Sequence, residues 1–260
     1  WMLFVNPLDA RFGWGRAAIQ FAFTIFILTE TWLMPVAGYL ADRFGSQRVT
    51  LAGGVLVGIA WVMNAYAGSL PTLYIAAALG GVGAAAVYSA SIGTALKWFP
   101  DRRGLAAGLT VAGFGTLAAL TLLPIQAMIK SSGVETVFLY FGIGQGLIVC
   151  LAALGITSPP AESVHATTPK ALEVRRNYRP LQVVQTPVFW MMYLILVLMA
   201  AGSLMATAHF ASLAADFRIA DVPVSILGLA LPALTFALAI DRVFSGLSLP
   251  FFGWLSYRIG

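Results

Sequence analysis

The chain alternates between long apolar runs and short charged segments. Glu30 is the one charged residue between positions 17 and 41, and residues 49–96 carry no charge at all. A helix needs about 20 consecutive apolar residues to cross a hydrocarbon core of about 30 Å. The runs therefore predict membrane-spanning helices, at residues 16–39, 49–67, 72–96, 105–129, 135–157, 187–213 and 223–252. The residues that precede them, which turn at Asn6 and Pro7, are expected to be the end of an earlier helix.

Composition supports a membrane protein. Hydrophobic residues make up 60% of the chain and charged residues 10%, whereas a soluble domain carries roughly 25% charged residues. The net charge is +5, but the basic residues lie between the predicted spans, where membrane topology accounts for them. We therefore expect a lipid bilayer as partner and no nucleic acid.

Residues that could build an enzymatic or metal site are scarce. Cys150 is the single cysteine of the chain, which excludes a disulfide framework and a cysteine metal site. His165 and His209 have no cysteine or carboxylate neighbours at metal-ligand spacing. Gly81 and Gly83 lie deep in a predicted helix with no lysine after them, so they do not form a phosphate loop. No metal, no cofactor and no enzymatic activity are expected.

The loops on alternate sides of the membrane differ in basic residues. The loops that follow the second, fourth, sixth and eighth helices hold ten, namely Arg43, Arg48, Lys97, Arg102, Arg103, Lys170, Arg175, Arg176, Arg179 and Arg258. The opposite loops hold four, namely Arg11, Arg16, Lys130 and Arg218. Because basic loops stay on the cytoplasmic side, this distribution predicts that the first set is cytoplasmic.

A charged motif joins the second and third predicted helices and recurs later. Residues 38–45 read GYLADRFG, and residues 253–260, 215 positions downstream, read GWLSYRIG and match at four of eight positions. The first copy, with the basic residues after it, resembles the signature loop of the major facilitator superfamily of transporters. Its repeat is expected for two parallel halves of one transporter.

The resemblance implies an all-α integral membrane fold with twelve helices in two six-helix bundles. This chain is expected to supply the end of helix one through helix eight. Residues 1–157 would belong to the N-terminal bundle, residues 158–186 would form a cytoplasmic linker, and residues 187–260 would begin the C-terminal bundle. The polar composition of 158–186, which contrasts with both flanks, supports the linker.

Local motifs resemble one branch of this superfamily. Asn6-Pro7, residues 97–106 (KWFPDRRGLA) and residues 186–190 (TPVFW) look like the oxalate:formate antiporter family, whose members exchange small carboxylates, and are similar also to monocarboxylate transporters. The chain departs from the pattern at two positions. Leu249 replaces the family arginine before a Pro-Phe stretch, and Tyr257 stands where the first signature loop has Asp42.

Charges inside the membrane are the strongest site candidates, because an ionised side chain at the bilayer centre costs at least about 2.5 kcal/mol. Glu30 is about 21 Å from Arg16 and about 18 Å from Asp42 along a helix that rises about 1.5 Å per residue, so it is predicted near the midplane. It is a candidate for substrate binding or proton transfer, or a structurally buried glutamate. Arg242 shares a helix face with Leu249 and could supply the missing positive charge, or it could form a structural pair.

The resemblance adds further candidates. Tyr88 and Phe114 match aromatic positions of the family's carboxylate pocket, although aromatic side chains on membrane helices more often serve packing. The charged residues of the signature loop are interpreted as a gate that holds the two bundles together until substrate shifts the balance. The gating set comprises Asp42, Arg43, Arg48 and Asp241.

The sequence thus favours a monomeric secondary transporter of small carboxylates in the plasma membrane, the inner membrane of a bacterial cell. Antiport by alternating access is the first interpretation. A proton-coupled monocarboxylate symporter, with Glu30 as the protonation site, is an alternative. A membrane-embedded sensor is a third.

Overall fold

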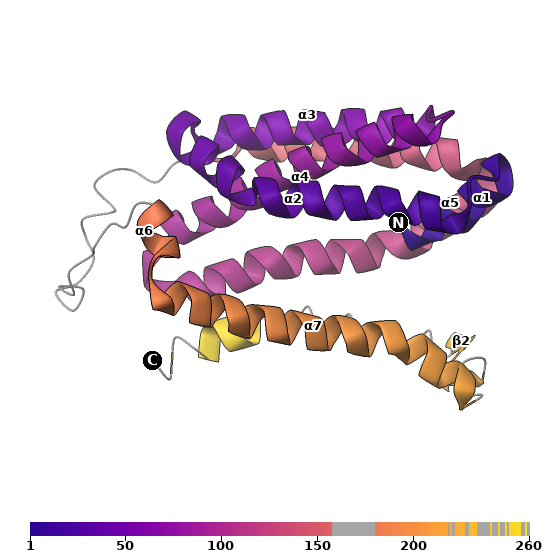
Figure 1. The fold of residues 1–260 in the computed structure, drawn as a ribbon. Coiled ribbons are helices and arrows are strands. Elements are labelled where there is room, and N and C mark those ends of the chain that lie inside the picture. The colour runs from indigo at the N-terminus through magenta and orange to yellow at the C-terminus, as the bar shows by residue number, and fades with distance from the viewer. Residues whose placement is uncertain are drawn as a thin grey trace. The chain divides into compact units, whose positions relative to one another are not determined.

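The computed structural model describes residues 1–157, 180–217, 219, 222–226, 229–232, 240, 244, 248, 250–255 and 258. Helices dominate this part of the chain (Figure 1). Four of the described helical segments are long and apolar enough to cross a membrane, namely α2 (Arg16–Phe44), α3 (Ser46–Ala65), α4 (Leu70–Trp98) and Ala127–Leu154 within α5 (Arg103–Leu154). The expected helical membrane fold is confirmed.

Contacts divide the chain into two compact units. Residues 1–165 together with 245–260 form the first unit, and residues 166–244 form the second. The expected division into a bundle, a linker and a second bundle at 157 and 186 stays a prediction.

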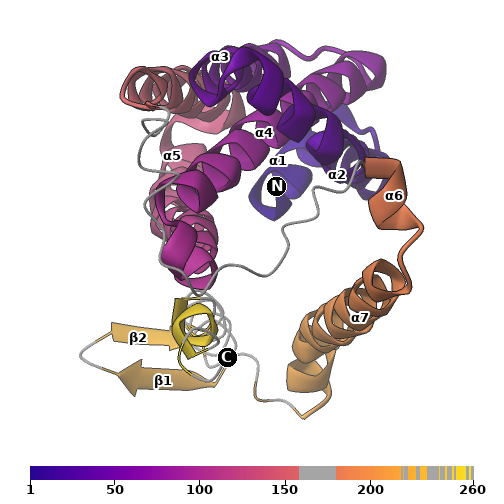
Figure 2. The same cartoon turned by 90° about the vertical axis from the view of Figure 1, so that its left-hand side faces the viewer.

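In the first unit, α4 packs along both α2 and α3, and α3 packs along α5. These helices run side by side along one direction, and α1 (Met2–Phe12) lies at one end of them (Figures 1 and 2). Apolar side chains on their outer faces are exposed, among them Trp32 on α2 and Leu147 on α5. An apolar exposed surface is what a bilayer requires of a spanning helix.

Two glycines with positive φ reverse the chain between helices. Gly45 has φ 92° and ψ 138° and separates α2 from α3 inside the signature loop. Gly133 has φ 82° and ψ 169° and divides α5 into two arms, which correspond to the helices expected at 105–129 and 135–157. Side chains other than hydrogen rarely adopt these angles, so both glycines fix the positions of the reversals.

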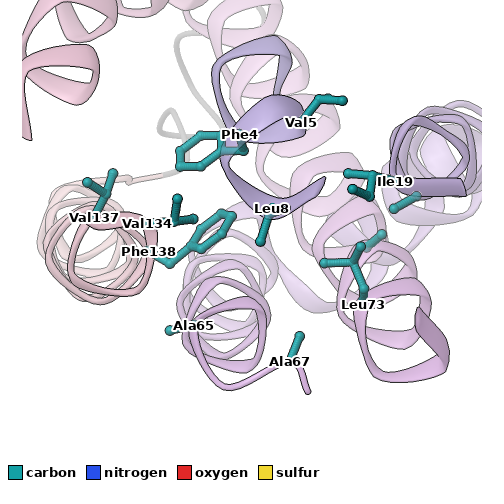
Figure 3. Close-up of a cluster of buried hydrophobic side chains, with 12 residues drawn as sticks. Phe4, Val5, Leu8, Ile19, Ala65, Ala67, Leu73, Val134, Val137 and Phe138 are labelled. Carbon is teal, nitrogen blue, oxygen red and sulfur yellow. The ribbon is translucent and has the colours of Figure 1, made fainter. Parts of the chain in front are cut away.

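A hydrophobic core gathers around α1 (Figure 3). Phe4 of α1 stacks on Phe138 of α5 with 4.4 Å between ring centroids, and Trp61 of α3 meets both rings edge-on. Ile19 of α2 and Leu73 of α4 are fully buried in the same cluster. This core therefore ties α1 to the four long helices at one end of the unit.

Glycines set the spacing of α4 from its two neighbours. A Cβ on Gly83 would lie 2.8 Å from the carbonyl oxygen of Gly53 on α3, and a Cβ on Gly81 would lie 2.6 Å from that of Phe26 on α2. In lipid the hydrophobic effect does not hold helices together, so they depend on close packing, which small residues allow. Gly81 and Gly83 thus serve the packing of α4 against its neighbours.

The first helix is longer than the sequence predicted. Asn6 and Pro7 were expected to end it, but α1 continues through Pro7 to Phe12, and Gly13 in the left-handed region closes it. A proline this near the start of a helix removes few backbone hydrogen bonds. Only residues 13–15 therefore separate α1 from α2.

The second unit contains α6 (Pro180–Val184), α7 (Pro187–Asp216) and a two-stranded antiparallel hairpin. The hairpin pairs β1 (Pro223–Ile226) with β2 (Leu229–Pro232), where the sequence analysis expected the start of helix eight. That expectation was wrong for residues 223–232. Val224 and Ile226 of β1 are β-branched, a residue type that favours strands, and β2 is apolar. The prolines occupy the paired ends, where a missing N–H is tolerated.

Candidate functional site

The crossing of α2 and α4 brings two predicted site residues together. Glu30 on α2 and Tyr88 on α4 are both half-buried, and they lie on two helices that pack along each other. Ser89, next to Tyr88, donates a 3.0 Å hydrogen bond to the carbonyl of Met34, one turn beyond Glu30. The close approach at Gly81 holds the same two helices together on the other side of Glu30, because its nearest neighbours include the Glu30 amide nitrogen.

Glu30 supplies a carboxyl group that can exchange a proton, and Tyr88 supplies a phenol. A carboxyl group accepts hydrogen bonds when ionised and donates one when protonated, and a phenol does both. Within α2, Glu30 is the one charged residue between Arg16 and Asp42. The crossing can therefore hold a proton, or orient the carboxylate of a ligand through a protonated Glu30 and the Tyr88 hydroxyl.

The other predicted substrate residues are not placed with this pair. Phe114 lies on the first arm of α5, where only the backbone is described. Arg242 and Leu249 lie outside the described residues, as does Asp241 of the gating set. Their roles stay predictions.

Three of the four gating residues lie at the end of α2 and the start of α3. Asp42 pairs with Lys97 at the end of α4, with 2.7 Å between carboxylate oxygen and ammonium nitrogen, and both side chains are largely exposed. Arg43 donates a 3.2 Å hydrogen bond to the Tyr39 hydroxyl, one turn earlier. Arg48 is exposed and has no ion pair within the described part of the chain. The described partner of Asp42 thus belongs to the same unit, and a clamp between two bundles stays a prediction.

Three residues of this region were not predicted as functional. Besides Lys97, Gln47 of α3 donates to the carbonyl of Leu154 at 3.2 Å, and Trp98 of α4 donates to the carbonyl of Thr157 at 2.8 Å. These bonds join the ends of α3, α4 and α5 beside the signature loop. The only sequence signal was indirect, since Lys97 and Trp98 open the KWFPDRRGLA motif and that loop was expected on the same side as Asp42.

Several known proteins similar to this chain are named as transporters. It is 32% identical to the oxalate:formate antiporter of Oxalobacter formigenes over 262 residues, which cover 100% of the chain and 59% of the antiporter. It is 28% identical to the MFS-type transporter YhjX of Escherichia coli over 194 residues, covering 74% of the chain and 47% of that protein. It is 34% identical to human monocarboxylate transporter 11 over 109 residues, covering 42% of the chain and 23% of that protein.

The chain spans less than two thirds of the length of each of these relatives. The expected resemblance to the oxalate:formate antiporter is confirmed, and with it the expectation of a transporter family and not an enzyme. The family model of the Major Facilitator Superfamily matches residues 1–260, that is, the whole chain. The chain therefore belongs to the Major Facilitator Superfamily.

Proposed function

We propose that the protein containing this chain is a secondary active transporter that exchanges small organic anions, of the oxalate and formate kind, by alternating access. The observation that carries the proposal is the similarity to the oxalate:formate antiporter, which extends over the whole chain. Glu30 and Tyr88 support it, because they are polar hydrogen-bonding groups within two packed helices of membrane length. Polar residues in such positions commonly mark a substrate or ion pathway.

Glu30 and Tyr88 would form one wall of the substrate path. An ionised Glu30 would repel an anion, so in this role Glu30 binds the substrate as the protonated acid, with Tyr88 as a second donor. The positive charge that an anionic substrate requires would come from Arg242. Phe114 would supply an apolar contact. Asp42, Arg43, Arg48 and Asp241 would control the change between inward-open and outward-open states.

Equilibrium binding to the purified whole protein tests the substrate class. Oxalate and formate should bind, whereas oxamide, which has the shape of oxalate without its charge, should bind at least about tenfold more weakly. Oxamide can still accept hydrogen bonds from a guanidinium, but it has no negative charge and loses the ion pair that a carboxylate forms there. Equal affinity for oxalate and oxamide would contradict an anion transporter.

Proton-coupled symport of a monocarboxylate is the second candidate. It is favoured by the similarity to monocarboxylate transporter 11 and by the placement of Glu30, whose carboxyl could carry the proton. Uptake of lactate or formate into vesicles without internal anion distinguishes the two modes. A pH gradient should drive such uptake in a symporter, whereas an exchanger requires an internal counter-anion.

We propose that the signature loop faces the cytoplasm of a plasma membrane and that the protein works as a monomer. The ten-to-four distribution of basic residues supports the orientation. Cysteine at the exposed position Asp101, in a background without Cys150, should be protected from an impermeant thiol reagent in intact cells. Cysteine at exposed Ser132, next to the reversal at Gly133, should react. The opposite pattern would contradict the orientation.

A further inference from the structure

A positively charged cavity lies where α5 begins. It has a volume of about 210 Å³ and is lined by Arg102, Leu105, Trp254 and Arg258. Arg102 ends the short 3₁₀ helix η1 (Pro100–Arg102), and Leu105 lies in the first turn of α5. Trp254 belongs to the helical residues 250–255. All four residues belong to the first compact unit.

Two glycines next to the lining residues make a close backbone contact. A Cβ on Gly104 would lie 2.9 Å from the carbonyl oxygen of Gly253, and a Cβ on Gly253 would overlap the carbonyl oxygen of Gly104. The first turn of α5 and the helical segment at 250–255 therefore touch directly. This contact brings Arg102, two residues before Gly104, and Trp254, directly after Gly253, to the same cavity.

The lining carries positive charge only. Neither Arg102 nor Arg258 has an ion pair within the described part of the chain, and the neighbouring Asp101 is exposed and does not line the cavity. The Arg258 guanidinium lies 5.1 Å from the centroid of the Trp254 ring, a cation–π contact that orients it. No side chain caps the amide groups of the first turn of α5, and the free amides of a helix start add further positive potential. An anion would complete this arrangement.

We propose that the cavity binds the phosphate group of an anionic phospholipid. A guanidinium pairs with two phosphate oxygens at once, and two guanidinium groups line this cavity. A water molecule occupies about 30 Å³ in the liquid, so the cavity has room for a phosphate group. Leu105 and Trp254 add apolar walls, which suit the glycerol and acyl part of a lipid better than a free anion. Tryptophan is also enriched at the headgroup level of membranes.

Lipid titration of the purified whole protein in a neutral detergent tests this site. Native mass spectrometry counts the bound phosphatidylglycerol molecules and gives the dissociation constant of the tightest site. The double variant Arg102→Gln, Arg258→Gln should weaken that site at least about tenfold. The single variant Arg102→Gln should also weaken it. Its matched control Arg103→Gln removes one charge from the adjacent, equally exposed residue, which does not line the cavity, and should bind as the wild type does.

Other outcomes would overturn the proposal. Wild-type affinity in the double variant would exclude this cavity as the tightest site, and an equal loss in Arg103→Gln would show unspecific attraction by the basic loop. Displacement of phosphatidylglycerol by inorganic phosphate at equal concentration would identify a site for a free anion. If the glutamine variant does not fold, Arg102→Lys with Arg258→Lys keeps both charges without the two-pronged geometry. That variant should then weaken lipid binding, and unchanged binding would contradict the proposed pairing.

Discussion

Replacing Gly81 with alanine is the sharpest structural test of the site, because Gly81 sets the distance between α2 and α4 beside Glu30. The new Cβ would lie 2.6 Å from the Phe26 carbonyl oxygen, 2.9 Å from the Thr29 Cβ and 3.1 Å from the Glu30 amide nitrogen. Two of these neighbours are backbone atoms, which cannot rotate away. The helices must therefore separate by about 0.8 Å before the first contact reaches the 3.4 Å at which ordinary van der Waals contact begins.

The expected loss of stability in Gly81→Ala follows from comparison with Gly93→Ala on the same helix. Nothing lies within 4 Å of a Cβ on Gly93. Both Gly→Ala substitutions gain a similar helix propensity of about 1 kcal/mol, so the difference between the two variants measures the overpacking alone. Overpacking of a well-packed contact costs about 1–3 kcal/mol. Gly81→Ala should thus have a free energy of unfolding lower than that of Gly93→Ala by about 1–3 kcal/mol.

Equilibrium unfolding of both variants of the whole protein in mixed micelles measures this difference. Oxalate binding provides the functional readout, because separation of the helices also moves Glu30 away from Tyr88. Gly93→Ala should keep the wild-type affinity, whereas Gly81→Ala should lose affinity. Equal stability and equal binding in the two variants would refute the close α2–α4 contact and with it the proposed pairing of Glu30 with Tyr88.

Three further predictions concern charged residues. Asp42→Asn and Lys97→Gln should each slow transport while leaving substrate affinity within a few-fold. Both variants should fold, since an exposed pair contributes only about 0.2–1 kcal/mol to stability. A large loss of affinity in binding assays would place the pair in the substrate site. Glu30→Gln should abolish uptake driven by a pH gradient but spare anion exchange, and full pH-driven uptake would rule out Glu30 as the proton carrier. Arg242→Gln should weaken anion binding at least about tenfold, whereas normal affinity in the double variant Asp241→Asn, Arg242→Gln would assign Arg242 to a structural pair.

The sequence predicted the spanning helices well because lipid imposes a simple pattern. Uncharged runs of sufficient length leave few alternatives to a helix, and the observed bounds of α2, α3 and α4 differ from the expected ones by five residues at most. The reversal at Gly133 was also visible, as a short polar stretch between two apolar runs. Fold class was therefore accessible from composition and periodicity.

The sequence did not predict local departures from the helical pattern or the partners of charged residues on other helices. Pro7 was taken as the end of a helix, yet α1 continues past it. The uncharged residues 223–232 resembled a helix start because hydropathy does not distinguish a helix from a short hairpin. The partner of Asp42 could not be chosen among several basic residues of neighbouring loops, and only the packing of α2 against α4 selects Lys97. The proposed pairing of Glu30 with Tyr88 likewise depends on a helix crossing that spacing along one helix cannot reveal.

The most direct test of anion exchange is counterflow in proteoliposomes that contain the whole protein. Vesicles loaded with formate and vesicles loaded with an impermeant neutral sugar receive the same external concentration of radiolabelled oxalate at equal internal and external pH. The proposed exchange predicts rapid oxalate uptake in the formate-loaded vesicles and little uptake in the others. Equal uptake in both kinds of vesicle, or uptake in neither, would contradict an exchanger of small organic anions.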